Sequence, residues 1–283
     1  MDRPDVPTRA RILSRDSAAN ETLEAGLREI LMNVVTKGLL LATRLTRIAV
    51  FNPLRLRHVF GWALAASAEV ADKSVDLLRI PAVLPEDLLP EEGPPPRMTL
   101  ALFPRTYAGV SLLELLCLIL LLKRSKAGAV FEFGTYKGVS TTQLALNLPE
   151  NGSVATLDLP EDHAAALLNI SDPLERQLAE EKGKGGLVPA ELRSRIRFLR
   201  QDSAAFDESP YAGRMDFVFV DGAHSADYVR NDSEKGWRML REGGIMAWHD
   251  CCVNDLDVVR YLLGSPFHPS RVVGTSLAFA AKR

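Results

Sequence analysis

The chain contains little cysteine: three residues in 283, of which Cys251 and Cys252 are adjacent. So few cysteines exclude a disulfide-stapled fold and favour a reducing compartment. The first residues, Met1 to Asp5, lack the basic region and the apolar stretch of a secretory signal. We therefore expect a cytoplasmic protein.

Long uncharged apolar runs are also missing. The densest run, from Leu112 to Leu122, contains Glu114 and is shorter than the roughly 18 residues that span a bilayer. The formal net charge of -2 comes from 34 basic and 36 acidic residues, so overall charge gives no sign of a nucleic-acid partner. A length of 283 residues, 47% of them hydrophobic, suits one large globular domain with an extension.

The chain before residue 97 divides into two parts. Residues 1–20 are polar, which predicts a flexible N-terminus. Residues 21–96 predict a helical extension and a Pro-rich linker, because apolar residues recur at helical spacing and six prolines follow between residues 81 and 96. Residues 30–60 are basic and free of acidic side chains. We favour packing of this stretch on the rest of the chain or in a homo-oligomer; a peripheral membrane contact through residues 30–60 is the alternative.

Residues 97–283 alternate between strand and helix patterns. Ser111 and Glu114 have capping-box spacing and predict a helix that ends near Lys126. The alternation predicts an α/β fold with a doubly wound, mostly parallel sheet and helices on both faces. The expected strands cover residues 130–133, 154–157, 196–199, 216–220 and 245–248, with helices near 226–241 and 256–263 and two closing strands at 271–273 and 277–281.

The loop after the first of these strands lacks the glycine spacing of a dinucleotide site. Gly134 and Gly138 are four residues apart, and Tyr136 stands where a dinucleotide site needs glycine. Glu132 at the strand end would repel a phosphate and suits a cationic ligand, such as S-adenosylmethionine (SAM). A buried structural carboxylate is the alternative role for Glu132.

Acidic residues also follow the next two strands. Asp158 is placed to accept hydrogen bonds from both ribose hydroxyls of a nucleotide, and a turn or helix-capping role is the alternative. Asp202 and Ser203 are placed near the adenine edge, and capping is again the alternative.

Two further aspartates, Asp221 and Asp250, end the last two predicted parallel strands. If these strands are neighbours, the two carboxylates can share a hard divalent ion such as Mg²⁺. His224 lies within a turn of Asp221 and can remove the proton of a substrate hydroxyl. Strand alternation predicts that His249 points away from Asp250 and has a structural role. A metal-free pair that orients substrate is the alternative for the two aspartates.

These motifs together resemble class I SAM-dependent methyltransferases, in particular the macrolide-sugar O-methyltransferase group and, more distantly, catechol and caffeoyl-CoA O-methyltransferases. The resemblance rests on the segments 132–138, 216–225 and 240–250 and on Asp158. It implies a Rossmann-like, seven-stranded sheet whose last strand is reversed. It also implies SAM contacts near the glycine loop, metal ligands at Asp221 and Asp250, and His224 as the base. The chain departs from the catechol-type pattern at Cys251, where an asparagine ligand is expected.

The predicted function is methyl transfer from SAM to a hydroxyl of a small molecule, such as a sugar, a glycan or another secondary metabolite, with Mg²⁺ as an optional aid. An NAD-binding oxidoreductase and a non-catalytic SAM-fold protein are the alternatives. The expected catalytic residues are His224 and Asp221, and the expected metal ligands are Asp221 and Asp250. The expected cofactor-binding residues are Glu132, Gly134, Thr135, Gly138, Ser140, Asp158, Asp202, Ser203 and Asp221.

Overall fold

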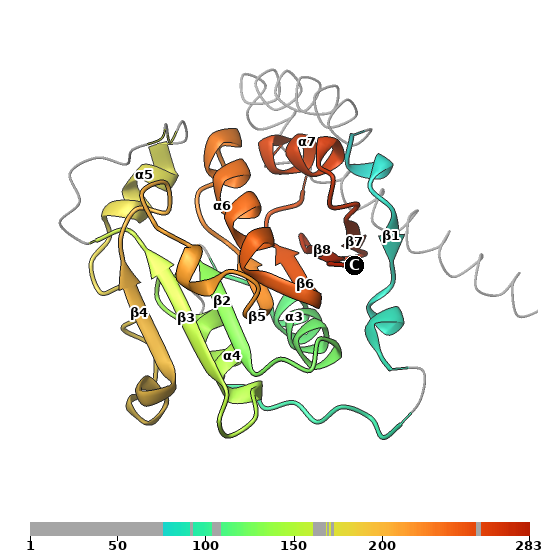
Figure 1. Ribbon diagram of the computed structural model, residues 1–283, viewed down its shortest axis with the longest axis horizontal. Coiled ribbons are helices and arrows are strands. Elements are labelled where there is room, and N and C mark those ends of the chain that lie inside the picture. The colour runs from blue at the N-terminus through green and yellow to red at the C-terminus, as the bar shows by residue number, and fades with distance from the viewer. Residues whose placement is uncertain are drawn as a thin grey trace, which may run out of the picture. The chain divides into compact units, whose positions relative to one another are not determined.

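The computed structural model describes residues 76–90, 93–103, 109–160, 168, 170, 173–252 and 256–283 (Figure 1). The predicted flexible segment 1–20, the helical part of the extension up to residue 75 and the basic stretch 30–60 lie outside these residues. Within the described residues, no helix is long and apolar enough to cross a membrane.

A single sheet of eight strands organises the described part of the chain. Its spatial order is β1-β7-β8-β6-β5-β2-β3-β4. Strand β8 pairs in antiparallel fashion with both of its neighbours, and every other pairing in the sheet is parallel. The strands are β1 (Ala82–Val83), β2 (Ala129–Phe133), β3 (Ser153–Asp158), β4 (Ile196–Arg200), β5 (Met215–Val220), β6 (Leu240–Trp248), β7 (Ser270–Val272) and β8 (Ala278–Ala281).

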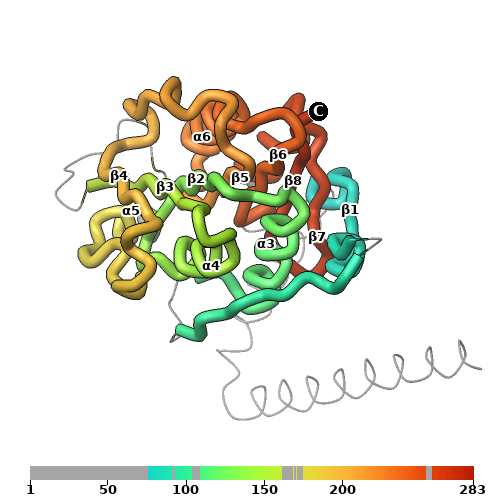
Figure 2. Tube along the Cα trace, turned by 60° about the horizontal axis from the view of Figure 1, so that its bottom comes forward, coloured from blue at the N-terminus to red at the C-terminus, as the bar shows by residue number. Residues whose placement is uncertain are grey.

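Helices cover both faces of this sheet. Helices α3 and α4 lie on one side and α6 on the other (Figure 2). The helices are α3 (Leu112–Arg124), α4 (Val139–Asn147), α5 (Pro173–Glu180), α6 (Ala226–Met239) and α7 (Leu256–Gly264), with short 3-10 turns η1 (Pro85–Leu88), η2 (Ala190–Arg195) and η3 (Ser209–Tyr211). This arrangement confirms the doubly wound α/β fold.

Two hydrophobic clusters fill the space between the sheet and its helices. Strand side chains alternate between them: Phe217 and Phe219 join the cluster under α3 and α4, whereas Val218 and Val220 join the one under α6 and α7. The same alternation puts Val130 and Phe131 on opposite faces. Replacing a fully buried side chain such as Phe131 with alanine would cost about 3–5 kcal/mol.

The predicted seven strands with a reversed last strand correspond to β2–β8. The eighth strand, β1, comes from the segment expected to be a Pro-rich linker. It forms an edge strand, where proline is tolerated. The carbonyls of Pro81 and Val83 accept hydrogen bonds from the backbone amides of Arg271 and Val273.

The predicted capping box at the start of α3 is present. The amide of Glu114 donates to the Ser111 hydroxyl at 3.3 Å, and the amide of Ser111 donates to the Glu114 carboxylate at 2.8 Å. The helix ends at Arg124, slightly before the predicted end, since Lys126 has a left-handed backbone with φ 52°. Helix α6 also ends two residues early, because β6 already begins at Leu240.

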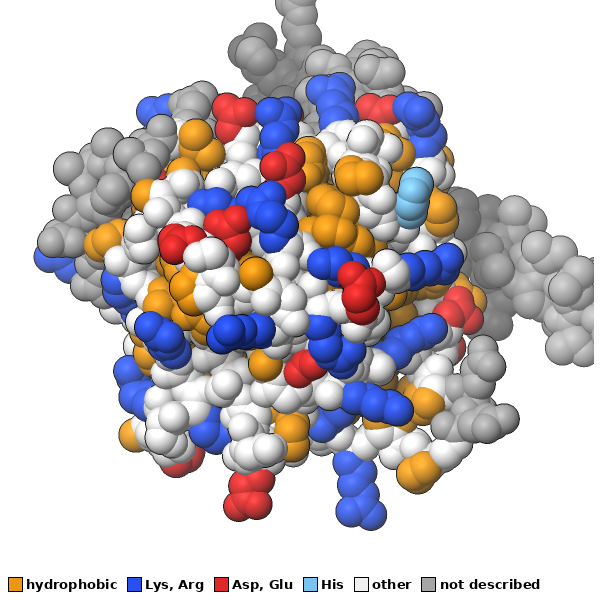
Figure 3. Space-filling view, viewed as in Figure 1, with side chains coloured by type: hydrophobic (Ala, Val, Ile, Leu, Met, Phe, Trp, Pro, Cys, Tyr) orange, Lys and Arg blue, Asp and Glu red, His pale blue; other side chains and the backbone are white. Residues whose placement is uncertain are grey.

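The surface carries charges of both signs. On the face in Figure 3, lysine and arginine side chains are spread over the domain with aspartate and glutamate side chains between them. Ion pairs such as Arg238–Glu208 at 2.8 Å join residues that are distant in the sequence. Such exposed pairs contribute little to stability, in the range of about 0–1 kcal/mol.

Candidate active site

A cavity of about 370 Å³ opens at the carboxyl ends of the central parallel strands. Residues that follow β2, β3, β5 and β6 line it, and α5 and α6 contribute further wall residues. Ligands of open α/β sheets bind in this position. The lining includes Gly134, Thr135, Ser140, Asp158, Ser203, Asp221, His224 and Asp250 from the predicted site.

The glycine loop forms one end of the cavity through its backbone. Gly134 has φ 91°, and a Cβ atom at this position would lie 1.9 Å from the carbonyl oxygen of Asp221. Gly138 has φ 87° and precedes the first residue of α4, where a Cβ would lie 2.5 Å from a methyl carbon of Val188. Both positions therefore require glycine for conformation and for space.

Asp158 is fixed by this loop. One of its carboxylate oxygens accepts hydrogen bonds from the amides of Thr135 and Tyr136, at 3.1 and 2.7 Å. The other lies 2.7 Å from the ammonium nitrogen of Lys184. These contacts hold the carboxylate at the cavity wall, and its remaining lone pairs can accept hydrogen bonds from a ligand.

Glu132 lies behind the wall and is not among the residues that line the cavity. Its side chain is fully buried and accepts hydrogen bonds from the hydroxyls of Thr141 and Thr156. Its second carboxylate oxygen has no hydrogen-bond partner. Burial raises the pKa of Glu132 to about 7, although the threonine hydroxyls oppose the shift. The predicted contact between Glu132 and a cationic ligand stays a prediction.

Two other predicted cofactor residues lie off the cavity wall. Gly138 shapes the loop without lining the cavity. Asp202 is buried and accepts a hydrogen bond from the Tyr228 hydroxyl at 2.8 Å. Tyr228 and Ser203 do line the cavity. Asp202 therefore contacts a wall residue, Tyr228, without lining the cavity itself.

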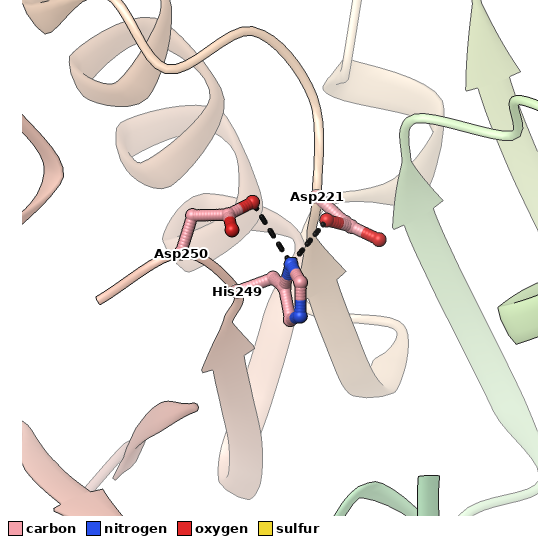
Figure 4. A group of neighbouring side chains, drawn as sticks. All are labelled: Asp221, His249 and Asp250. Carbon is pink, nitrogen blue, oxygen red and sulfur yellow. Dashed lines mark hydrogen bonds and ion pairs between the residues drawn. The ribbon is translucent and has the colours of Figure 1, made fainter. Parts of the chain in front are cut away.

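The part of the cavity wall beside the glycine loop is a cluster of ionisable side chains at the ends of β5 and β6. The two strands are neighbours, as predicted, and their register pairs Val220 with Trp248. The residues that follow, Asp221 and His249, therefore stand side by side. Nδ1 of His249 lies 3.0 Å from Asp221 Oδ1 and 2.8 Å from Asp250 Oδ2 (Figure 4).

The prediction that His249 points away from the site is wrong. Side chains along β6 do alternate between the two faces of the sheet. The register between β5 and β6, however, places His249, and not Asp250, beside Asp221. The strand ends at Trp248, and Asp250 has φ 56°, so its carboxylate turns back toward the ring of His249. The sequence pattern shows alternation but not register.

His249 also faces a carboxylate on its other side. Its Nε2 atom lies 3.5 Å from Oε2 of Glu114, which begins α3. Burial would lower the pKa of His249, but Asp221, Asp250 and Glu114 raise it well above the usual value. Burial would raise the pKa of Glu114, but His249 and the hydrogen bonds from Ser276 and Ser111 lower it well below its usual range.

His224 bridges two carboxylates from different parts of the chain. Its Nε2 atom lies 2.7 Å from Asp250 Oδ2, and its Nδ1 atom lies 3.0 Å from Oε1 of Glu175 on α5. The backbone amide of His224 also donates to Glu175 at 3.2 Å. Burial would raise the pKa of Asp250, but hydrogen bonds from His224 and His249 lower it strongly.

The chemistry of the cluster fits a divalent cation. One ligand atom each from Asp221, His249 and Asp250 lies within 4.8 Å of the others. Cys251, which replaces the expected asparagine, is not part of this group. Its side chain belongs to a hydrophobic cluster, and burial raises the pKa of its thiol to about 12.

Sequence reasoning missed several wall residues. Glu175 lies in a charged insert whose pattern gives no sign of a site, and Tyr228 and Asp232 lie one helical turn apart on α6. Asp232 is buried, which raises its pKa to about 7. A polar pair at i and i+4 within the helix after a site strand is the signal that could have found Tyr228 and Asp232.

The strand order, the reversed β8 and the glycine loop define the fold class of class I SAM-dependent methyltransferases. Residues 131–251 match a family model described as "Methyltransferase domain". The match begins within β2 and runs past the end of β6, so it includes the glycine loop, Asp158, Asp221, His249 and Asp250.

Two curated relatives match part of the chain. Residues of this chain are 27% identical over 150 residues to a caffeoyl-CoA O-methyltransferase of Stellaria longipes, covering 51% of this chain and 55% of the relative. They are 28% identical over 131 residues to a probable caffeoyl-CoA O-methyltransferase of Dictyostelium discoideum, covering 46% of each. The chain thus spans about half the length of the curated relatives it matches.

Among solved structures, an O-methyltransferase from Bacillus cereus in complex with SAH aligns with a TM-score of 0.45 at 19% identity. The alignment covers 62% of this chain and 84% of that one.

Proposed function

We propose that this protein transfers a methyl group from SAM to a hydroxyl of a small molecule. The observation that carries the proposal is that one cavity is lined by two differently built groups: the glycine loop with Asp158, and His224 with Asp221 and Asp250. The methyltransferase family match and the O-methyltransferase relatives support the same reaction class.

The glycine-loop end would hold the cofactor. Asp158 is anchored by two loop amides and Lys184, and its free lone pairs suit the two hydroxyls of a ribose. Thr135 and Ser140 line the cavity beside it, and Ser203 and Tyr228 stand where the adenine edge is expected. When bound, SAM supplies the electrophilic methyl group.

His224 would act as the base in the ionisable cluster. Glu175 contacts both its Nδ1 atom and its backbone amide, which fixes the ring and directs Nε2 toward Asp250. An acceptor hydroxyl that displaces this contact with Asp250 would give its proton to Nε2, while the methyl group would pass from the sulfonium sulfur of SAM to the acceptor oxygen and leave SAH. Holding acceptor and methyl group in line supplies the remaining acceleration.

Asp221 and Asp250 are the residues that would hold a divalent cation, and such an ion would lower the pKa of a bound acceptor hydroxyl. Asp250 lies 2.7 Å from Nε2 of His224, and both aspartates lie within 3.0 Å of Nδ1 of His249, so the base and the carboxylates lie together. The acceptor class that we expect is a small molecule with a hydroxyl, such as a sugar or a glycan.

The test is SAH release from SAM in the presence of a panel of sugars, catechols and phenylpropanoid hydroxyl compounds. We expect SAH formation that depends on one acceptor class. With that acceptor, His224→Ala should lower kcat by about 10²–10⁴-fold and leave SAM affinity unchanged. Unchanged turnover in His224→Ala would reject the base, and absence of SAM binding to the wild-type protein would reject the reaction class.

A further inference from the structure

We propose that His249 is a third protein ligand in a divalent-cation site with Asp221 and Asp250, and that it makes the site prefer a borderline ion such as Fe²⁺, Co²⁺ or Zn²⁺ over Mg²⁺. The inference builds on the proposed function, in which the two aspartates hold a cation. It adds a ligand that neither the sequence pattern nor the relatives' names point to, and it changes the class of metal.

The distances around Nδ1 of His249 match those between ligands of one ion. Two adjacent ligands in an octahedron, each about 2.1 Å from the metal, are about 3.0 Å apart. Nδ1 lies 3.0 Å from Asp221 Oδ1 and 2.8 Å from Asp250 Oδ2. The three side chains come from two adjacent strand ends and converge on one point beside the cavity (Figure 4).

The outer side of the imidazole faces a carboxylate, the kind of partner that metal-binding histidines have. Glu114 Oε2 lies 3.5 Å from Nε2, which makes no hydrogen bond in this structure, and a closer approach on metal binding would let the carboxylate accept the ring N–H and leave Nδ1 for the metal. Glu114 is itself held by the amide and hydroxyl of Ser276, both at 2.8 Å, and by the amide of Ser111. The N-terminus of α3 thus supports the site through a carboxylate–histidine pair.

The donor set decides the kind of ion. Mg²⁺ selects oxygen ligands and water, whereas imidazole nitrogen suits Zn²⁺, Fe²⁺ and other borderline ions. A third ligand at Cys251 would change this preference, but that side chain is buried in a hydrophobic cluster and its amide donates to the carbonyl of Ser276. The three ligands leave coordination positions open for water or an acceptor oxygen.

The experiment is a Co²⁺ titration of the full-length protein at fixed neutral pH, without SAM or acceptor, followed by visible absorption and calorimetry. Mg²⁺ is titrated separately. We expect Co²⁺ to bind at least about 10-fold more tightly than Mg²⁺. His249→Asn, which offers an oxygen donor near the position of Nδ1, should weaken Co²⁺ binding about 10-fold or more and change Mg²⁺ binding little. His268→Asn, at an exposed histidine, is the matched control and should change neither.

A second variant tests the outer partner. Glu114→Gln should weaken Co²⁺ binding about 10-fold, within the range known for partners of metal-bound histidines. Wild-type protein loaded with Co²⁺ should also show a strongly shifted exchangeable ring proton in its NMR spectrum, a readout that requires no variant. Equal Co²⁺ affinity in the wild type and His249→Asn, or no shifted ring proton, would overturn the proposal. Because no methyl transfer is measured, a failure of the proposed function would leave these results unaffected.

Discussion

Around the glycine loop the cavity wall is backbone; at the ends of β5 and β6 it is ionisable side chains. Gly134 approaches the carbonyl of Asp221 so closely that no side chain fits, and the loop amides hold Asp158. In the ionisable cluster, His249 and His224 contact four carboxylates from α3, α5 and the ends of β5 and β6. Steric exclusion of side chains determines the structure of the glycine loop. Ion pairs and the register between β5 and β6 determine the structure of the ionisable cluster.

Because of this difference, we expect substitutions in the two parts of the wall to affect different properties of the protein. A wall made by close backbone approach tolerates no Cβ, so replacing its glycines should act on folding. A wall made of charged side chains can lose one group and keep its fold, so its substitutions should act on binding or chemistry. The predictions below test that separation, from the largest expected effect to the smallest.

Gly134→Ala should lower the free energy of unfolding by about 4 kcal/mol or more, because its Cβ would lie 1.9 Å from a backbone oxygen in a left-handed conformation. Gly213→Ala is the matched control: it also has positive φ, but nothing lies within 4 Å of its Cβ. We expect about 1–2 kcal/mol for the control. Urea unfolding measures both, and equal losses would show that close approach does not define this end of the cavity.

The buried carboxyl of Glu132 should make stability depend on pH. Its pKa is about 7 in the folded protein and near 4.5 when unfolded, so between these values only the folded protein keeps the proton. Stability should therefore fall as the pH rises from about 4.5 to 7, by about 3 kcal/mol for this group. Asp232, with a pKa of about 7, acts in the same direction.

Urea unfolding at pH 5 and pH 8 tests this prediction. Glu132→Gln should remove only part of the pH dependence, because the contributions of Asp232 and of His249, whose raised pKa acts in the same direction, remain. An unaltered pH dependence in Glu132→Gln would mean that Glu132 is ionised in the folded protein, as a direct contact with a cationic ligand would favour.

Asp158→Asn should weaken SAM binding about 10–100-fold, since a charged acceptor of hydrogen bonds is lost at the cavity wall. Asp227→Asn, which changes an exposed carboxylate on α6, should leave SAM affinity unchanged. Calorimetry measures both variants. If the Asp158→Asn protein binds SAM as tightly as the wild type, then Asp158 only holds the loop and does not contact SAM.

Ser111→Ala should lower the free energy of unfolding by about 1 kcal/mol through loss of the α3 cap. Since Glu114 keeps its contacts with Ser276, the ionisable cluster should be preserved. Ser194→Ala, at an exposed position, is the control for urea unfolding. If Ser111→Ala lowers the free energy of unfolding by several kcal/mol, then loss of the α3 cap also disrupts the ionisable cluster.

The backbone-built end was predictable from the sequence because its constraints are local. Two glycines at a strand-to-helix turn, and an acidic residue after the next strand, indicate the loop and Asp158 without any knowledge of packing. The alternation of apolar segments likewise predicted the strands of the sheet and the antiparallel tail, confirmed by β7 and β8.

The ionisable end could be predicted only in part. Asp221, His224 and Asp250 stood out as polar residues at or just beyond strand ends, but the place of His249 depends on the register between β5 and β6. Glu114 and Glu175 reach the cluster from helices more than 45 residues away in the sequence, and neither pattern nor spacing reports such contacts. The edge strand β1 was missed for the same reason.

Calorimetric titration of the full-length protein with SAM and, separately, with NAD⁺ tests the central claim most directly. The account predicts saturable SAM binding that Asp158→Asn weakens and His224→Ala leaves intact, with no heat of binding from NAD⁺. Binding of NAD⁺ without binding of SAM would contradict it.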